Sequence, residues 1–250
     1  MSASWHDKVY QRPLIVIPPK GTSVTMNRLS TPSRLVRPLA AAVVLIVLSK
    51  SLMAYRDYLP PNFSSDFLQG RRSYFFGGYH VAFYAHILSG PLALLVATIL
   101  MSDTFRRRWP LWHRRFGRLE VAVVLLAVAP SGLWMARYAA AGPVAAVGLA
   151  VLALLTAACA ALGWRAAVRN QFHDHERWMW RTYLLLASAI VLRLMGGLAT
   201  VAGVSAAWFN PAAVWASWVV PLAAHELSVW IGPSIRGVSG CRSPGRPSRA

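Results

Sequence analysis

Long apolar runs separated by short arginine-rich segments dominate the pattern of this chain. At ~1.5 Å per helical residue, about 20 residues cross the hydrocarbon layer of a membrane. A shorter first run reaches this length if Lys50 extends toward an interface. The pattern therefore predicts an all-α transmembrane helix bundle with six spans, at residues 38–58, 80–101, 119–138, 143–164, 182–202 and 208–231.

Composition supports a membrane protein and argues against other classes. Hydrophobic residues make up 56% of the 250 positions and charged residues 14%, whereas about a quarter of a soluble domain is charged. The net charge of +18 would fit a nucleic-acid partner if the bases formed one patch. They flank the apolar runs instead, so the pattern predicts a lipid bilayer as partner and no nucleic acid.

Basic residues alternate between successive connections, which predicts the orientation. Residues 106–118 contain six Arg and residues 165–181 contain four, while Arg137 is the single base between the third and fourth spans. Because arginine-rich connections stay in the cytoplasm, we expect a multi-pass protein of the inner (plasma) membrane with both termini cytoplasmic. The basic connections are expected to lie against anionic lipid headgroups.

The polar ends of the chain frame the expected membrane domain. Residues 1–37 are expected to form a basic, flexible cytoplasmic segment, residues 38–232 the six-helix domain and residues 233–250 a disordered basic tail. The first apolar run also fits a signal peptide cleaved near residues 51–54, although an uncleaved anchor is preferred. Met26 is an alternative start to Met1, and the sequence leaves both questions open.

Ionisable residues inside the spans are the best candidates for function, because an unpaired charge in hydrocarbon is costly. His86 shares a helical stripe of small residues, which predicts an interior position. Arg193 lies near the middle of its span with no acidic residue at its depth. Its candidate partners are carbonyls freed by Pro91 or Pro130, an anionic substrate or a cofactor carboxylate.

The last span ends in a polar seam formed by His225 and Glu226. This seam is either a proton or ion path, or a packing surface that ends in a salt bridge from Glu226 to Arg118 or Arg181. Both interpretations stay open.

Histidines also occur in the basic connections, which are expected to be loops. Two histidines separated by one residue, such as His173 and His175, point to opposite sides of a helix, and no Cys or third nearby His completes a metal site. No P-loop, dinucleotide-binding glycine motif, zinc-protease motif or nucleophile triad is present. We therefore predict no metal site and no catalytic residue.

Several spaced motifs carry a family resemblance over about residues 58–231. They are His86-Ile-Leu-Ser-Gly90-Pro-Leu-Ala, the pairs His113-Arg114 and Gly117-Arg118, His175-Glu-Arg-Trp178-Met179-Trp-Arg181-Thr-Tyr183, and Ala224-His225-Glu226-Leu. Together they resemble the bacterial membrane proteins grouped as domain of unknown function 2306. The resemblance implies a multi-pass bundle and marks His86, His113, His175 and Glu226 as pattern positions, without implying an activity. Glu120 departs from the pattern, which has an aromatic residue there.

Three functions stay open at this point. A redox protein would bind haem b or quinone through His86, His113, His175 or His225, although two axial ligands must come from facing helices at equal depth. Because His80 and His86 share one helix, a pair of His225 with His113 or His175 fits better. A small anion or proton-coupled transporter would use Arg193 and Glu226. A noncatalytic component would bind lipid, another membrane protein or a second copy of the chain.

Overall fold

The computed structural model describes residues 36–65, 67–204 and 206–238. Within these ranges the regular elements are helical and no strand forms, which confirms the all-α fold. The chain divides into two units, Met1–Ala41 and Ala42–Ala250, and each is described by itself. Most of the expected N-terminal segment, and residues 239–250 of the expected tail, lie outside the described residues.

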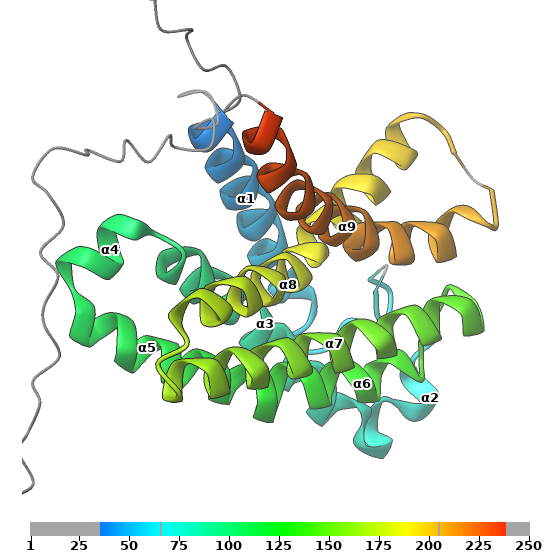
Figure 1. The fold of residues 1–250 in the computed structure, drawn as a ribbon. Coiled ribbons are helices and arrows are strands. Elements are labelled where there is room, and N and C mark those ends of the chain that lie inside the picture. The colour runs from blue at the N-terminus through cyan, green and yellow to red at the C-terminus, as the bar shows by residue number, and fades with distance from the viewer. Residues whose placement is uncertain (1–35, 66, 205, 239–250) are drawn as a thin grey trace, which may run out of the picture. The chain divides into compact units, whose positions relative to one another are not determined.

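The second unit is a bundle of long helices (Figure 1). In the described part of the chain, five helices are long and apolar enough to cross a membrane, at residues 72–100, 110–136, 142–168, 172–201 and 209–231. Residues 233–238 of the expected tail are helical. In chain order the elements are α1 (Val36–Met53), η1 (Ala54–Asp57), α2 (Arg72–Tyr74), η2 (Phe75–Tyr79), α3 (His80–Leu100), α4 (Asp103–Arg108), α5 (Pro110–Val123), η3 (Val124–Val128), α6 (Ala129–Ala136), α7 (Gly142–Val168), α8 (Phe172–Val201) and α9 (Phe209–Val238).

The basic connections are mostly helical, so the prediction of loops there is wrong. Ser102 caps α4 by accepting a hydrogen bond from Phe105 N at 3.4 Å, and α5 begins with a proline at its first turn. On α5 the Trp112 and Phe116 rings stack at 5.5 Å, while the arginines beside them are exposed. Such an amphipathic segment is stable as a helix at a membrane interface, which a search for apolar runs does not detect.

One end of the bundle collects these arginines, and we call it the basic end. It is the end where α5 and α8 begin and α7 finishes, as the hydrogen bond of 2.9 Å between His175 of α8 and Gly163 O of α7 shows. The opposite end holds the start of α7 and α9, where Trp215 Nε1 donates to Val144 O at 3.1 Å. Helix α7 therefore runs antiparallel to α8 and parallel to α9.

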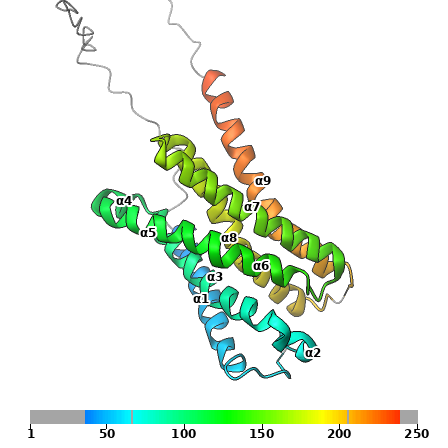
Figure 2. The ribbon, with the colours of Figure 1, turned by 90° about the horizontal axis from the view of Figure 1, so that it is seen from below.

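Helix α7 packs against α6, α8 and α9 through small residues (Figure 2). A Cβ atom added at Gly148 would lie 2.9 Å from the indole nitrogen of Trp215, and one added at Gly163 would lie 2.7 Å from the sulfur of Met179. Because lipid chains are as apolar as helix side chains, close backbone approach replaces the hydrophobic effect as the source of packing energy. These two glycines therefore set the spacing of α9 and α8 from α7.

An apolar core fills the space between α3, η3, α7 and α8. Its members are small or aliphatic, and we refer to them as the apolar core: Ala93, Leu94, Ala97, Val124, Val128, Ala160, Leu186 and Ile190. Val124 and Ala160 have no exposed surface. The core therefore forms a closed apolar layer in the middle of the bundle.

A cluster of aromatic rings covers the start of α3 and surrounds the buried Arg71. The guanidinium of Arg71 donates to Phe67 O at 2.6 Å, to the Tyr79 hydroxyl at 3.2 Å and to Tyr138 O at 3.0 Å. Gly78, with a φ of +104°, makes the turn that brings Tyr79 under this group. Arg71 thus ties the segment before α3 to the loop that follows α6.

Candidate functional site

His86 lies on α3 against α6, in the half of the bundle farther from the basic end. Its Nδ1 is 3.1 Å from Ser131 Oγ and 3.3 Å from Val128 O, and a Cβ atom at Gly132 would lie 3.2 Å from its Cε1. A carbonyl oxygen only accepts hydrogen bonds, so in the neutral ring Nδ1 carries the hydrogen and Nε2 keeps a lone pair. His86 is therefore held by α6 through one nitrogen.

Arg193 of α8 is the charged group beside His86. It interacts electrostatically with both His86 and Tyr55. The Tyr55 hydroxyl donates to Ile87 O, the carbonyl one turn before Pro91, which proline leaves without an intrahelical donor. We call Tyr55, His86 and Arg193 the His86 group.

Arg193 has no carboxylate partner within the described residues. Its side chain is exposed in the isolated chain, and its Nη1 donates to Ala189 O of its own helix at 3.1 Å. A guanidinium offers five N–H donors, so most of its hydrogen-bonding capacity is left for another group. An anion beside α8 would supply the missing charge.

A second polar group lies on one face of α5. His113 and Glu120 are seven residues apart, or about two helical turns, which places them on the same face. Glu120 is only 2% exposed. Of the buried side-chain polar atoms in the described residues, His113 Nδ1, Glu120 Oε1 and Trp218 Nε1 lack a hydrogen-bond partner. Two of these three atoms therefore lie on the α5 face.

Gly117 places no side chain on the α5 face between His113 and Glu120. A Cβ atom placed at Gly117 would meet no atom within 4 Å. Buried polar groups almost always find a partner, and a lone buried carboxylate is very costly. The α5 face therefore holds a buried carboxyl oxygen and a buried imidazole nitrogen that both lack a hydrogen-bond partner.

His175 of α8 joins this group at the basic end. It donates from Nδ1 to Gly163 O at 2.9 Å and interacts electrostatically with His113, so its Nε2 is left with a lone pair in the neutral ring. Among the expected pattern positions, His113 and His175 come together from two helices. No three potential metal ligands gather in the part of the chain that is described.

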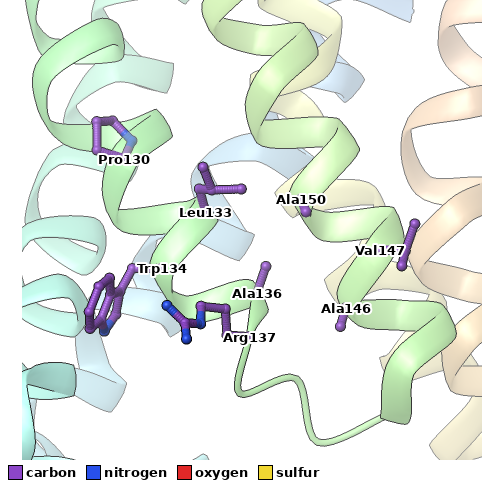
Figure 3. A pocket seen from close by; sticks show the side chains of 8 residues that line it. All are labelled: Pro130, Leu133, Trp134, Ala136, Arg137, Ala146, Val147 and Ala150. Carbon is purple, nitrogen blue, oxygen red and sulfur yellow. The ribbon is translucent and has the colours of Figure 1, made fainter.

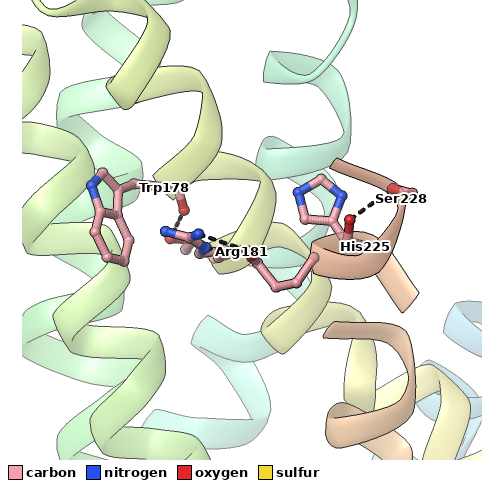
Figure 4. A network of polar contacts seen from close by, with 6 residues as sticks. Trp178, Arg181, His225 and Ser228 are labelled. Atoms are coloured by element: carbon pink, nitrogen blue, oxygen red, sulfur yellow. Dashed lines mark hydrogen bonds and ion pairs between the residues drawn. The ribbon is translucent and has the colours of Figure 1, made fainter. Parts of the chain in front are cut away.

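Glu226 is engaged in an ion pair that joins α9 to α8. Arg181 donates from Nε to Oε1 at 2.6 Å and from Nη2 to Oε2 at 2.9 Å, and its Cζ lies 4.4 Å from the centre of the Trp178 ring. Figure 4 shows Arg181 between Trp178 and the part of α9 that carries His225. Of the alternatives left open for Glu226, the structure forms the salt bridge to Arg181, and both carboxylate oxygens are occupied.

His225 is held apart from the other histidines. Its ring stacks on Trp180 of α8 with the two centroids 6.0 Å apart. Among the contacts of the described residues, none joins His225 to His113 or His175. The structure therefore offers no support for pairing His225 with either of them as axial ligands of a haem.

Glu120 is the residue that sequence reasoning missed. It lies in the first turn of the expected third span, where a charged residue is normally interpreted as the end of the apolar segment. It also stands where the family pattern has an aromatic residue. The available signal was its seven-residue spacing from His113, which places both side chains on one face only if the basic connection is helical.

A family model described as "Predicted membrane protein (DUF2306)" matches residues 83–229. The chain belongs to this family. No curated protein and no solved structure matches the chain. The matched DUF2306 region contains the α5 face, His86, His175 and the Arg181–Glu226 pair, so both polar groups lie mainly within the part that defines the family.

The Arg181–Glu226 pair is expected to stabilise the α8–α9 contact. Glu226→Gln should lower stability by roughly 1–2 kcal/mol, or about 3–6 °C in thermal unfolding of the detergent-solubilised protein. The reason is that Arg181, whose side chain is only 18% exposed, would keep its charge without a carboxylate. The charge swap of Arg181→Glu with Glu226→Arg should recover part of the loss.

Asp103→Asn is the matched control. It breaks the Arg106–Asp103 pair, which has the same 2.6 Å separation but side chains that are 47% and 71% exposed. Its effect should stay within about 0.5 kcal/mol. Equal losses in the two variants would contradict a special role for the α8–α9 pair.

Proposed function

We propose that this member of the DUF2306 family is a proton-coupled transporter of a small anion. One observation carries the proposal: Glu120 is a buried carboxyl group with an unpartnered oxygen, in a helix long and apolar enough to cross a membrane. Intramembrane carboxyl groups of this kind are typical of proton relays. Burying Glu120 without a partner is costly, and departures of this kind are typical of functional sites.

The α5 face gives protons a route from the basic end to Glu120. His175 and His113 lie at the entrance, and an imidazole ring can both bind and release a proton. In the proposed route water enters beside Gly117, which has no side chain, and connects the imidazoles to the carboxyl group. In this scheme the imidazoles exchange protons with water, and Glu120 accepts a proton in the low-dielectric interior, where the neutral acid is favoured.

The apolar core separates Glu120 from the His86 group. Val124 and Val128 follow Glu120 along the same helix and are buried against α3, so the arrangement corresponds to a closed state. The wide turn η3 begins directly after the Glu120 segment, and such π-type turns often mark functional sites within helices. A rearrangement at η3 would connect the two polar groups.

Arg193 supplies the anion site of the proposed transporter. Its guanidinium has unused donors, has no carboxylate partner in the described part of the chain and lies near the Tyr55 hydroxyl and His86. A guanidinium is suited to carboxylate, phosphate and similar anions. His86 and Tyr55 would complete the site.

The topology belongs to the same proposal. Arginines at the basic end favour a cytoplasmic location for that end, next to anionic headgroups of an inner membrane. Helix α1 has 18 residues, close to the length of a span, and as a sixth span it would place both termini in the cytoplasm.

A redox protein is the second candidate. His113 and His175 come from different helices, interact electrostatically and lie at one end of the bundle, which is the relation that two axial haem ligands require. Haem b or a quinone between them would replace the proton route with electron transfer at the same place.

Cysteine labelling tests the orientation. In a Cys241→Ser background, Val204→Cys should react with a membrane-impermeant thiol reagent added to intact cells, whereas Arg169→Cys should react only after lysis. Both positions are exposed and lie at opposite ends of α8, so they make a matched pair. The reverse pattern, or equal labelling of both, would contradict the proposed topology.

Proton flux into proteoliposomes, measured with an enclosed pH-sensitive dye, tests the role of Glu120. Glu120→Gln should reduce flux to the level of protein-free vesicles, because an amide keeps the shape but does not exchange a proton. Glu176→Gln is the control, since Glu176 is an exposed acid on α8. Glu120→Leu should also lose flux while retaining or gaining thermal stability, because it removes an unpaired buried polar group.

Two outcomes would overturn the role of Glu120. One is full flux in Glu120→Gln, and the other is a wild-type flux no greater than that of empty vesicles. An absorption spectrum of the purified protein separates the redox candidate: a Soret band lost in His175→Ala and kept in His86→Ala would favour haem over transport.

Arg193→Gln tests the anion site in the same vesicles with chloride, nitrate or phosphate gradients. The stimulation of proton flux by the preferred anion should fall at least about tenfold, since hydrogen bonds to a charged group contribute roughly 1.5–3 kcal/mol. Arg193→Lys should keep part of the stimulation, because lysine preserves the positive charge but not the planar guanidinium group. Arg165→Gln, an exposed arginine at the basic end, is the control, and unchanged anion dependence in Arg193→Gln would exclude the site.

A further inference from the structure

A groove runs between α6 and α7 at the end of the bundle opposite the basic end. Its volume is about 510 Å³. The wall from α6 includes Leu133 and the wall from α7 includes Ala146, Val147 and Ala150, as Figure 3 shows. The groove forms because the side chains on α7 are small. Leu133 and Val147 have exposed fractions of 39% and 56%, so the groove opens outward from the bundle.

A cation and an indole ring mark the mouth of this groove. Arg137 is exposed and follows the last residue of α6, and its Cζ lies 5.3 Å from the centre of the Trp134 ring. Tryptophan rings and arginines near helix ends favour the headgroup level of a membrane. The groove therefore passes from the headgroup level at Arg137 into the hydrocarbon depth along α6 and α7.

The position of Arg137 is fixed by its neighbour. Arg71 donates from Nη1 to Tyr138 O at 3.0 Å, and the Tyr138 ring stacks on Tyr74 at 4.6 Å. The chain next to Arg137 is thus held by the aromatic cluster. Within the described residues no carboxylate forms an ion pair with Arg137, so its charge is available to a ligand.

We propose that this groove binds one phospholipid with an anionic headgroup, with the phosphate on Arg137 and an acyl chain along the groove wall. Charge complementarity selects the headgroup, and the apolar walls select the chain. The groove volume lies within the range of small-molecule sites, about 300–1,000 Å³. A helix of a partner or of a second copy is about 10–12 Å wide and is a larger occupant than a site of this class holds. The site is independent of the proposed transport function and of the basic end.

The experiment compares lipids retained by the full-length protein. Protein solubilised from vesicles of phosphatidylglycerol and phosphatidylcholine in equal amounts is analysed by native mass spectrometry. The wild type should keep one phosphatidylglycerol per chain with about a tenfold preference, because the choline ammonium of phosphatidylcholine offsets the phosphate charge that Arg137 would bind. Arg137→Gln should abolish the preference, and Arg72→Gln, an exposed arginine at the start of α2, should leave it unchanged.

Two further variants separate the chain site from the headgroup site. Ala150→Phe should reduce retention of both lipids by filling the groove, and a thermal unfolding midpoint equal to that of the wild type shows that the fold persists. If Ala150→Phe does not fold, Ala146→Leu provides the same test with a smaller side chain. Glycerol phosphate, which has no acyl chain, should not displace the lipid.

Three results would overturn the proposal. They are equal retention of the two lipids by the wild type, an unchanged preference in Arg137→Gln, and a dimer or a bound protein in place of lipid.

Discussion

The absence of water within the membrane is the constraint on which the rest of the structure depends, because every polar group at that depth must find its partner inside the chain. Hydroxyl groups return to their own helix: Ser89 donates to Ala85 O at 2.6 Å and Thr98 to Leu94 O at 2.7 Å. The Tyr55 hydroxyl donates to the carbonyl that Pro91 leaves without a donor in its helix. The Arg71 guanidinium donates to carbonyl and phenol oxygens. Against this background an unpartnered Glu120 is a departure that a purely structural role does not explain.

Much of the bundle could be predicted from the sequence, because length and hydropathy alone decide where a chain can cross a membrane. The start of α3 at His80 was predicted to the residue, and the partner of Glu226 was found among two candidates because a carboxylate near a helix end needs a nearby base. The helical start of α5 was missed, since it depends on a cap at Ser102 and on stacked rings and not on hydropathy. If residues 110–123 are not helical, the side chains of His113 and Glu120 do not lie on the same face, so the sequence pattern alone does not bring them together.

The two polar groups and the apolar core divide the interior into three layers. Near the basic end are His175, His113 and Glu120, in the middle is the closed apolar layer, and beyond it His86 lies near Arg193. Helix α7 is locked to α8 and α9 where Gly148 and Gly163 allow close contact. Motion between the layers is therefore expected on the side of α3, η3 and α6, where His86 and Ser131 meet across the helix pair.

The wide turn η3 limits how the length of this helix can change. Its N–H of Ala129 bonds to Val124 O, five residues back, so the turn holds one residue more than a regular helix does. Loss of a single codon there would restore the regular winding and rotate everything before it by about 100° relative to α6. The carboxyl group of Glu120 would then swing out of the interior toward lipid. The extra residue in η3 thus sets the side of the helix on which the acid lies.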